Sequence, residues 1–136
     1  MSDGPARLVA AATALYAVGL SAVTLLMLVS FATEHDLGIF TQYLWLLGHL
    51  HEPFGTIALR PMLVDHFQPT VALLAPLGAL GIAPAGLLVL QSLAIAVVAV
   101  LLRAVARQRG AEGWIAAVPA VLWLVSPVVV KANLYE

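Results

Sequence analysis

The chain has 136 residues, of which 62% are hydrophobic and only 10% are charged. Soluble domains of this size carry about 25% charged residues, so the composition argues against a water-soluble domain and indicates a polytopic membrane protein. The formal net charge is -1, and no basic stripe with interleaved aromatic residues is present, which argues against nucleic-acid binding. Cysteine is absent, which excludes disulfides and thiolate metal sites.

Three stretches are long enough to cross a bilayer, which requires about 20 apolar residues. The first, residues 8–32, exceeds the hydrophobic region of roughly 7–15 residues in a cleavable signal peptide, so we predict a retained span. The last stretch contains Pro119 and Pro127, which bundled membrane helices tolerate when neighbours satisfy the freed carbonyls. We predict a cytoplasmic stub at 1–7, transmembrane helices at 8–32, 85–107 and 114–132, a cytoplasmic turn at 108–113, and an external end at 133–136.

Basic residues set the expected orientation. With three spans and a cytoplasmic N-terminus, the cytoplasmic face holds Arg7, Arg103, Arg107 and Arg109, as the positive-inside tendency requires. The apolar stretch Thr70–Leu80 is too short for a full crossing, and counting it as one would move the last three arginines outside. We therefore expect an integral protein of a bacterial or archaeal plasma membrane.

The long external loop, residues 33–84, is predicted to be structured. Residues 37–51 combine a broad apolar face with a narrow polar strip, which is typical of an amphipathic helix in the membrane interface. Tyr43 and Trp45 suit headgroup depth, and Pro53 ends the helix. A short interfacial or re-entrant helix is expected at 67–81. The predicted fold class is all-α, a set of polytopic membrane helices surrounded by lipid.

The reactive side chains gather in this loop. Its histidines, carboxylates and arginine are His35, His49, His51, His66, Glu34, Asp36, Glu52, Asp65 and Arg60. A wet loop explains the charged residues well, but it explains the concentration of all four histidines less well.

Asp36 follows directly on the first predicted span. One interpretation is structural, because Thr33-x-x-Asp36 matches a capping box and Asp36 could itself cap the helix that starts at Leu37. The functional interpretation is that a carboxylate at the membrane surface takes a proton from an acceptor hydroxyl. Glu34, His35 and Asp36 in series could alternatively hold a divalent cation, although adjacent residues in a helix point apart.

Asp65 and His66 form a second polar cluster. A carboxylate beside an imidazole can bind a metal, pair with a base or meet a phosphate, and it can equally cap a helix. Arg60 could bind a phosphate through its planar guanidinium or extend to lipid headgroups. His49 and His51 do not share a helix face, which disfavours a metal-binding pair.

Five short blocks carry a recognisable pattern: His35-Asp36-Leu37-Gly38-Ile39-Phe40-x-Gln42, Asp65-His66-Phe67-x-Pro69, Leu74-Ala75-Pro76-Leu77, Leu88-x-Leu90-Gln91-Ser92 and Asn133-Leu134-Tyr135-Glu136. In this order they resemble the N-terminal part of the DUF2079 family of predicted membrane proteins, from Asp36 onward. In that family the last block normally continues into Phe-His. Together with the small interior that three helices can enclose, this leads us to expect the front of a longer protein, inactive on its own.

DUF2079 is similar to the GT-C superfamily, whose polytopic glycosyltransferases use polyprenyl-phosphate sugar donors and invert the anomeric centre. The resemblance implies that Asp36 is the essential acidic residue after the first span. It also implies that Asp65 and His66 engage a divalent metal or the donor phosphate. Further residues expected near the substrate or metal are Glu34, His35, Gln42, Arg60 and Glu136. The spacing of Glu34 and Asp36 matches a D-x-D pair only loosely, and the remaining spans of such enzymes are missing.

Two other functions compete with a glycosyltransferase. A transporter or channel component is disfavoured, because intramembrane ionisable residues usually mark transport pathways and these spans have almost none. A non-catalytic membrane scaffold with a structured outer loop stays open as an alternative.

Overall fold

The computed structural model describes residues 4–33, 35–56, 59–65 and 68–134, with the backbone alone for Leu63 and Asp65. It confirms an all-α fold. Its long helices are α1 (Gly4–Val29) and α5 (Ala83–Gln108), beside the shorter α6 (Val118–Val125) and α7 (Pro127–Leu134). The remaining elements lie between α1 and α5 or precede α6: α2 (His35–Gly48), β1 (Phe54–Gly55), β2 (Arg60–Pro61), α3 (Met62–Asp65), the 3-10 helix η1 (Pro69–Leu74), α4 (Ala75–Ala79) and the 3-10 helix η2 (Ile115–Ala117).

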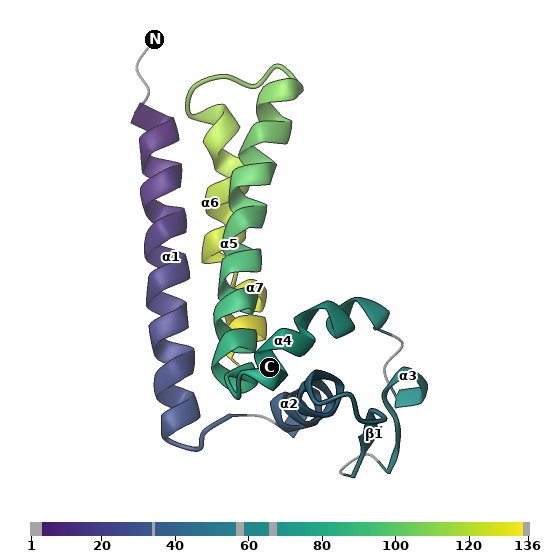
Figure 1. The fold of residues 1–136 in the computed structure, drawn as a ribbon. Coiled ribbons are helices and arrows are strands. Elements are labelled where there is room, and N and C mark those ends of the chain that lie inside the picture. The colour runs from purple at the N-terminus through teal and green to yellow at the C-terminus, as the bar shows by residue number, and fades with distance from the viewer. Residues whose placement is uncertain (1–3, 34, 57–58, 66–67, 135–136) are drawn as a thin grey trace.

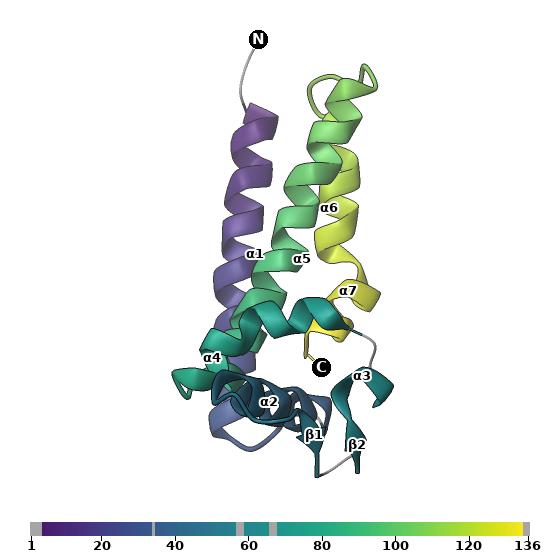
Figure 2. The same cartoon turned by 45° about the vertical axis from the view of Figure 1, so that its right-hand side comes forward.

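The helices form an upright bundle and a transverse layer. Helices α1, α5 and α6 run side by side, whereas α2 and the η1–α4 segment cross the same end of the bundle (Figure 1). We call this transverse layer, from α2 through α4, the ledge. Turned by 45°, the molecule shows η1 and α4 lying over α2, with the short hairpin beside α3 (Figure 2).

Two helices of the described chain, α1 and α5, are long and apolar enough to cross a membrane. Each has 26 residues, which gives a length of about 39 Å at 1.5 Å per residue, against a hydrocarbon thickness of about 30 Å. Helix α1 begins before residue 8, because Pro5 lies in its first turn, where the missing N–H is not needed. The predicted cytoplasmic position of its N-terminus stays a prediction.

The third predicted span, 114–132, is broken in the structure. Helices α6 and α7 meet at a bend of 43°, and they count as a third span only if the bent pair is taken as one. Ser126 is extended, with φ -62° and ψ 121°, because a residue before proline avoids the helical region. Pro127 then has no N–H to continue the helical hydrogen bonds, so the chain changes direction there.

Small residues allow the upright helices to approach closely. The core of the bundle combines Val9 of α1, Ala99 of α5, and Ala117, Ala120 and Leu124 of the η2–α6 segment. Moving an apolar side chain from lipid to a helix interface gains little free energy, because lipid tails are themselves apolar. Close packing and interhelical hydrogen bonds therefore hold membrane helices together. The indole of Trp123 supplies one such bond, donating to the carbonyl of Ile95 at 2.9 Å.

Left-handed residues end two helices earlier than the hydropathy pattern predicts. Helix α1 ends at Val29 rather than 32, and α2 runs from His35 to Gly48 rather than from 37 to 51. After α2, Leu50 has φ 58°, and His51 N–H donates to the carbonyl of Leu46 at 2.8 Å. Phe31, with φ 55°, occupies the same position after α1. Both turns are Schellman motifs, which an apolarity pattern does not reveal.

The ledge has its own close packing. Gly78 of α4 lies against the backbone carbonyl of Leu44, and Gly48 of α2 lies against the backbone of Ala79, with no room for a Cβ at either glycine. Tyr43 is fully buried in a second core with Ile39 and Met62. Gly78 and Gly48 therefore allow the backbones of α2 and α4 to touch where the two helices cross.

Two features of the ledge differ from the prediction. The helix expected at 67–81 is a 3-10 segment, η1, followed by the single short helix α4, since Pro76 cannot donate the hydrogen bond that an α-helix needs there. An unpredicted hairpin pairs Phe54 with Pro61 and Gly55 with Arg60. Its strands have two residues each, which is too short for an alternation of apolar and polar residues to reveal them in the sequence.

Candidate functional site

Asp36 lies in the first turn of α2, next to the end of α1 where the chain turns into the ledge. The helix already includes His35, so Asp36 is not its N-cap, as one interpretation of the sequence had it. A carboxylate in the first turn also favours the helix through the macrodipole. The side chain is exposed and is available to a ligand.

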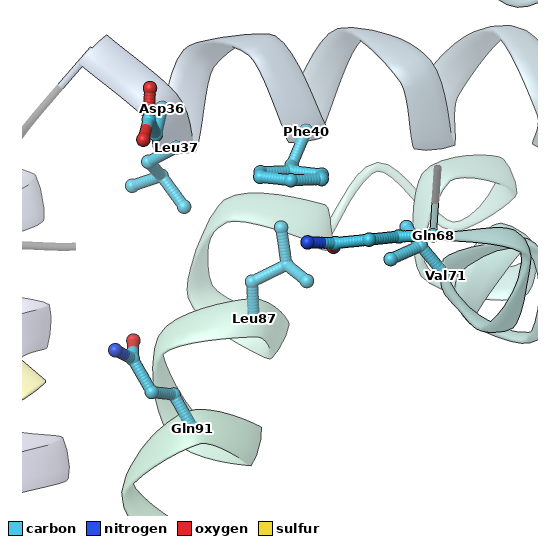
Figure 3. A pocket seen from close by; sticks show the side chains of 7 residues that line it. All are labelled: Asp36, Leu37, Phe40, Gln68, Val71, Leu87 and Gln91. Atoms are coloured by element: carbon cyan, nitrogen blue, oxygen red, sulfur yellow. The ribbon is translucent and has the colours of Figure 1, made fainter. Parts of the chain in front are cut away.

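Asp36 lines a cavity of about 220 Å³ between the ledge and the bundle, which we call the Asp36 cavity. Three polar side chains and four apolar ones line it, namely Asp36, Gln68 and Gln91 with Leu37, Phe40, Val71 and Leu87. They come from α2, η1 and its preceding residue, and α5 (Figure 3). A small set of convergent polar groups above apolar walls is the usual composition of a ligand site.

Gln91 ties the Asp36 cavity to α7, which lies at the ledge end of the bundle (Figure 1). Its amide Nε2 donates to the carbonyl of Ala132 in α7 at 3.0 Å. This bond uses one of the two N–H groups, so the second N–H and the amide oxygen are left for the cavity. The same side chain thus shapes the cavity and holds α7.

The neighbouring residues Ser92 and Asn133 strengthen this connection. Asn133 Nδ2 donates to Ser92 Oγ at 3.1 Å, and the single hydroxyl proton of Ser92 can then reach the carbonyl of Leu88, also at 3.1 Å. Both polar side chains are completely buried. Two of the five sequence blocks, Leu88–Ser92 and the one that begins at Asn133, therefore contact each other.

A second cavity, of about 350 Å³, lies on another side of the first turn of α2. It is lined by Leu28, Thr33, His35, Leu37, Gly38, Thr41 and Pro84, and we call it the His35 cavity. Leu37 borders both cavities. Consecutive side chains at 35 and 36 therefore serve different spaces, as expected for adjacent residues of a helix.

This geometry bears on the alternative that residues 34–36 hold a cation in series. His35 and Asp36 do not line a common cavity, and Glu34 lies outside the residues that the structure describes. No group of three or more His, Asp or Glu side chains in the described ranges could hold a metal ion.

Gln42 serves the hairpin. Its Nε2 donates to Thr56 Oγ1 at 2.6 Å, and its Oε1 accepts from the Thr56 N–H at 3.0 Å. Gln42 lines neither cavity. Its observed contacts are those of a side chain that fixes a loop.

Of the other predicted site residues, Arg60 has a described side chain, and it lines neither cavity. Arg60 lies in β2 with an exposed side chain, and its carbonyl accepts a hydrogen bond from Tyr43 Oη at 3.5 Å. Asp65 is the last residue of α3, described in its backbone only. His66 and Glu136 lie outside the described residues.

His49 and His51 lie beyond the end of α2, and both contact Trp45. Because α2 ends at Gly48 and the turn at Leu50 reverses the chain, both imidazoles stack on the indole of Trp45, at centroid distances of 4.4 and 5.8 Å. The premise that residues 49 and 51 belong to one helix was wrong.

Reasoning from the sequence missed Gln68 and Gln91 as lining residues. Gln91 carried a signal, because an amide is unusual in an apolar span and needs a partner there. Gln68 stands next to the Asp65–His66 cluster, but only the fold brings it to α2.

Two apolar helices of spanning length define this chain as a helical integral membrane protein. It belongs to the DUF2079 family of predicted membrane proteins, whose pattern matches residues 27–136. The match confirms the resemblance seen in the sequence blocks and covers well over half of the chain. No curated protein and no solved structure matches it.

Proposed function

We propose that this chain forms the Asp36-bearing part of a GT-C-type membrane glycosyltransferase, which transfers a sugar from a polyprenyl-phosphate donor at the outer face of the membrane. The observation that carries the proposal is the Asp36 cavity itself. Its lining includes one exposed carboxylate and two amides next to the start of α5, and these are groups that a lipid-linked phosphosugar could bind.

In the proposed reaction, the Asp36 carboxylate accepts the proton of an acceptor hydroxyl. The hydroxyl oxygen forms a bond to the anomeric carbon from the face opposite the phosphate. The bond between that carbon and the phosphate oxygen breaks, the phosphate leaves with the electron pair, and the anomeric configuration inverts.

The remaining lining residues have binding roles in this proposal. The free amide groups of Gln68 and Gln91 would hydrogen-bond sugar hydroxyls or phosphate oxygens. Phe40 and Leu87 offer apolar surface to the sugar face and to the start of the lipid tail.

The proposal includes a divalent metal ion, which Asp65 and His66 would hold. A carboxylate and an imidazole are ordinary donors for such an ion, and the ion would neutralise the phosphate charge when bound. Asp36 can accept a proton without such an ion. Among the described residues, it belongs to no group of three acidic or histidine side chains that could hold a metal ion.

The test is the substitution Asp36→Asn in the protein as it occurs in its native membrane. Membranes are supplied with a panel of polyprenyl-phosphate-linked radiolabelled hexoses, and transfer to endogenous acceptors is counted. Loss of a general base lowers the rate about 10²–10⁴-fold. Glu52→Gln is the matched control, because Glu52 is also an exposed carboxylate of the ledge region and lines neither cavity. Unchanged transfer by the Asp36 variant would reject the catalytic role of Asp36.

A further inference from the structure

The line of buried residues along α5 leads to a charged residue, Arg103, toward the end of the bundle opposite the ledge. Buried Ser92, Ala96 and Ala99 follow one another at intervals of four and three residues, and Arg103 continues the series. Ala99 packs with Val9 of α1. Arg103 therefore stands one turn beyond the packed core, on the face of α5 that meets the other helices.

Arg103 is only half-buried, but its Nε is shielded from solvent and has no hydrogen-bond partner within the described structure. Burying a guanidinium N–H without a partner is unfavourable. No ion pair joins Arg103 to an acidic side chain of the described residues, and Glu112 in the nearby turn is exposed.

Arg103 lies five residues before the end of α5, toward the end of the bundle opposite the ledge. The start of α1, the far end of α5 and the start of α6 lie together at this end of the molecule (Figures 1 and 2). Because α1 and α5 are antiparallel and longer than the hydrocarbon layer, their ends emerge where lipid phosphates lie. Arg107 follows one turn after Arg103, so both guanidinium groups share one side of the helix.

The helix macrodipole does not account for Arg103. The favourable effect of a cation is confined to the last turn of a helix, and the basic residue in the last turn of α5 is Arg107. Arg103 lies before that turn. Its charge serves another purpose.

We propose that Arg103 and Arg107 bind the phosphate of an anionic phospholipid at the membrane face opposite the ledge. Guanidinium groups match phosphate oxygens with paired, charge-assisted hydrogen bonds. A lipid phosphate at this depth gives the shielded Nε of Arg103 the acceptor that it lacks. This site is separate from the Asp36 cavity and does not depend on its proposed chemistry.

Native mass spectrometry of the full chain, purified in detergent, tests the proposal. The chain is titrated with phosphatidylglycerol and with phosphatidylcholine, and the retained lipid is counted. We expect preferential retention of phosphatidylglycerol, about fivefold weaker for each of Arg103→Gln and Arg107→Gln. Lys131→Gln, which removes an exposed cation from the last turn of α7, is the control and leaves retention unchanged.

Two results would overturn the proposal. Equal retention of the two lipids by the original chain would mean that no anionic headgroup is selected. Displacement of phosphatidylglycerol by millimolar inorganic phosphate would show a site for free phosphate instead of lipid. Arg107 is exposed in the last turn of α5, so Arg107→Gln folds and keeps the test decisive even if Arg103→Gln does not.

Discussion

Asn133 donates a hydrogen bond to Ser92 across 3.1 Å, joining positions 41 residues apart in the chain. Neither side chain is exposed, so both depend on partners within the protein for their hydrogen bonds. Together with the bond from Gln91 to Ala132, it fixes the segment after the α6–α7 bend against α5. The wall of the Asp36 cavity and the end of α7 are thus one connected structure.

Asn133→Ala is expected to lower the free energy of unfolding by about 1 kcal/mol, the scale of interhelical hydrogen bonds in membrane proteins. Thermal unfolding in detergent measures the change. A double-mutant cycle with Ser92→Ala isolates the pair, because the second substitution costs little once the partner is gone. Strictly additive effects would contradict a direct interaction.

Gly78→Ala is expected to destabilise the ledge by about 1–3 kcal/mol, because the new Cβ would collide with the backbone carbonyl of Leu44. The same measurement applies. Gly19→Ala is the matched control, since nothing lies within 4 Å of a Cβ built there and alanine is the better helix former. Equal effects of the two substitutions would show that the crossing of α2 and α4 is not packed at Gly78.

Leu50→Gly is expected to stabilise the chain by about 0.5–1 kcal/mol. Leu50 has φ 58° and is 94% exposed, so glycine removes backbone strain and few contacts. Leu26→Gly provides the comparison, because Leu26 is also exposed but lies inside α1, where glycine costs about 1 kcal/mol. A loss of stability at both positions would argue against the left-handed turn.

Gln42→Ala is expected to speed hydrogen exchange of the Thr56 amide at least tenfold, since both bonds to Thr56 are lost. Gln42→Glu should leave exchange slow, because a carboxylate accepts from both the N–H and the hydroxyl of Thr56. Gln108→Ala, at the exposed end of α5, is the control. Fast exchange in the glutamate variant would mean that Gln42 does not fix the hairpin in this way.

The apolar spans and the polar region between them were predictable, because hydropathy depends on composition over a long window. The ends of α1 and α2 were not, since Phe31 and Leu50 adopt left-handed conformations that are uncommon outside glycine. The hairpin was missed for a different reason. It depends on the contact between Gln42 and Thr56, fourteen residues apart, and not on any strand pattern.

The candidate site was predictable in part. Asp36 stood out because a carboxylate directly after a span is chemically conspicuous. Its neighbours could not be identified in the same way, since Gln91 reaches the cavity only because the first part of α5 packs against α2. A sequence shows which residues can do chemistry, whereas the packing of helices decides which of them meet.

Leu37 borders both the Asp36 cavity and the His35 cavity. The two cavities thus share one lining residue, whose aliphatic side chain is buried in the structure. A ligand that fills one cavity and displaces the Leu37 side chain would change the volume of the other cavity. A ligand bound on one side of α2 would in this way affect binding on the other side without movement of the helix backbone.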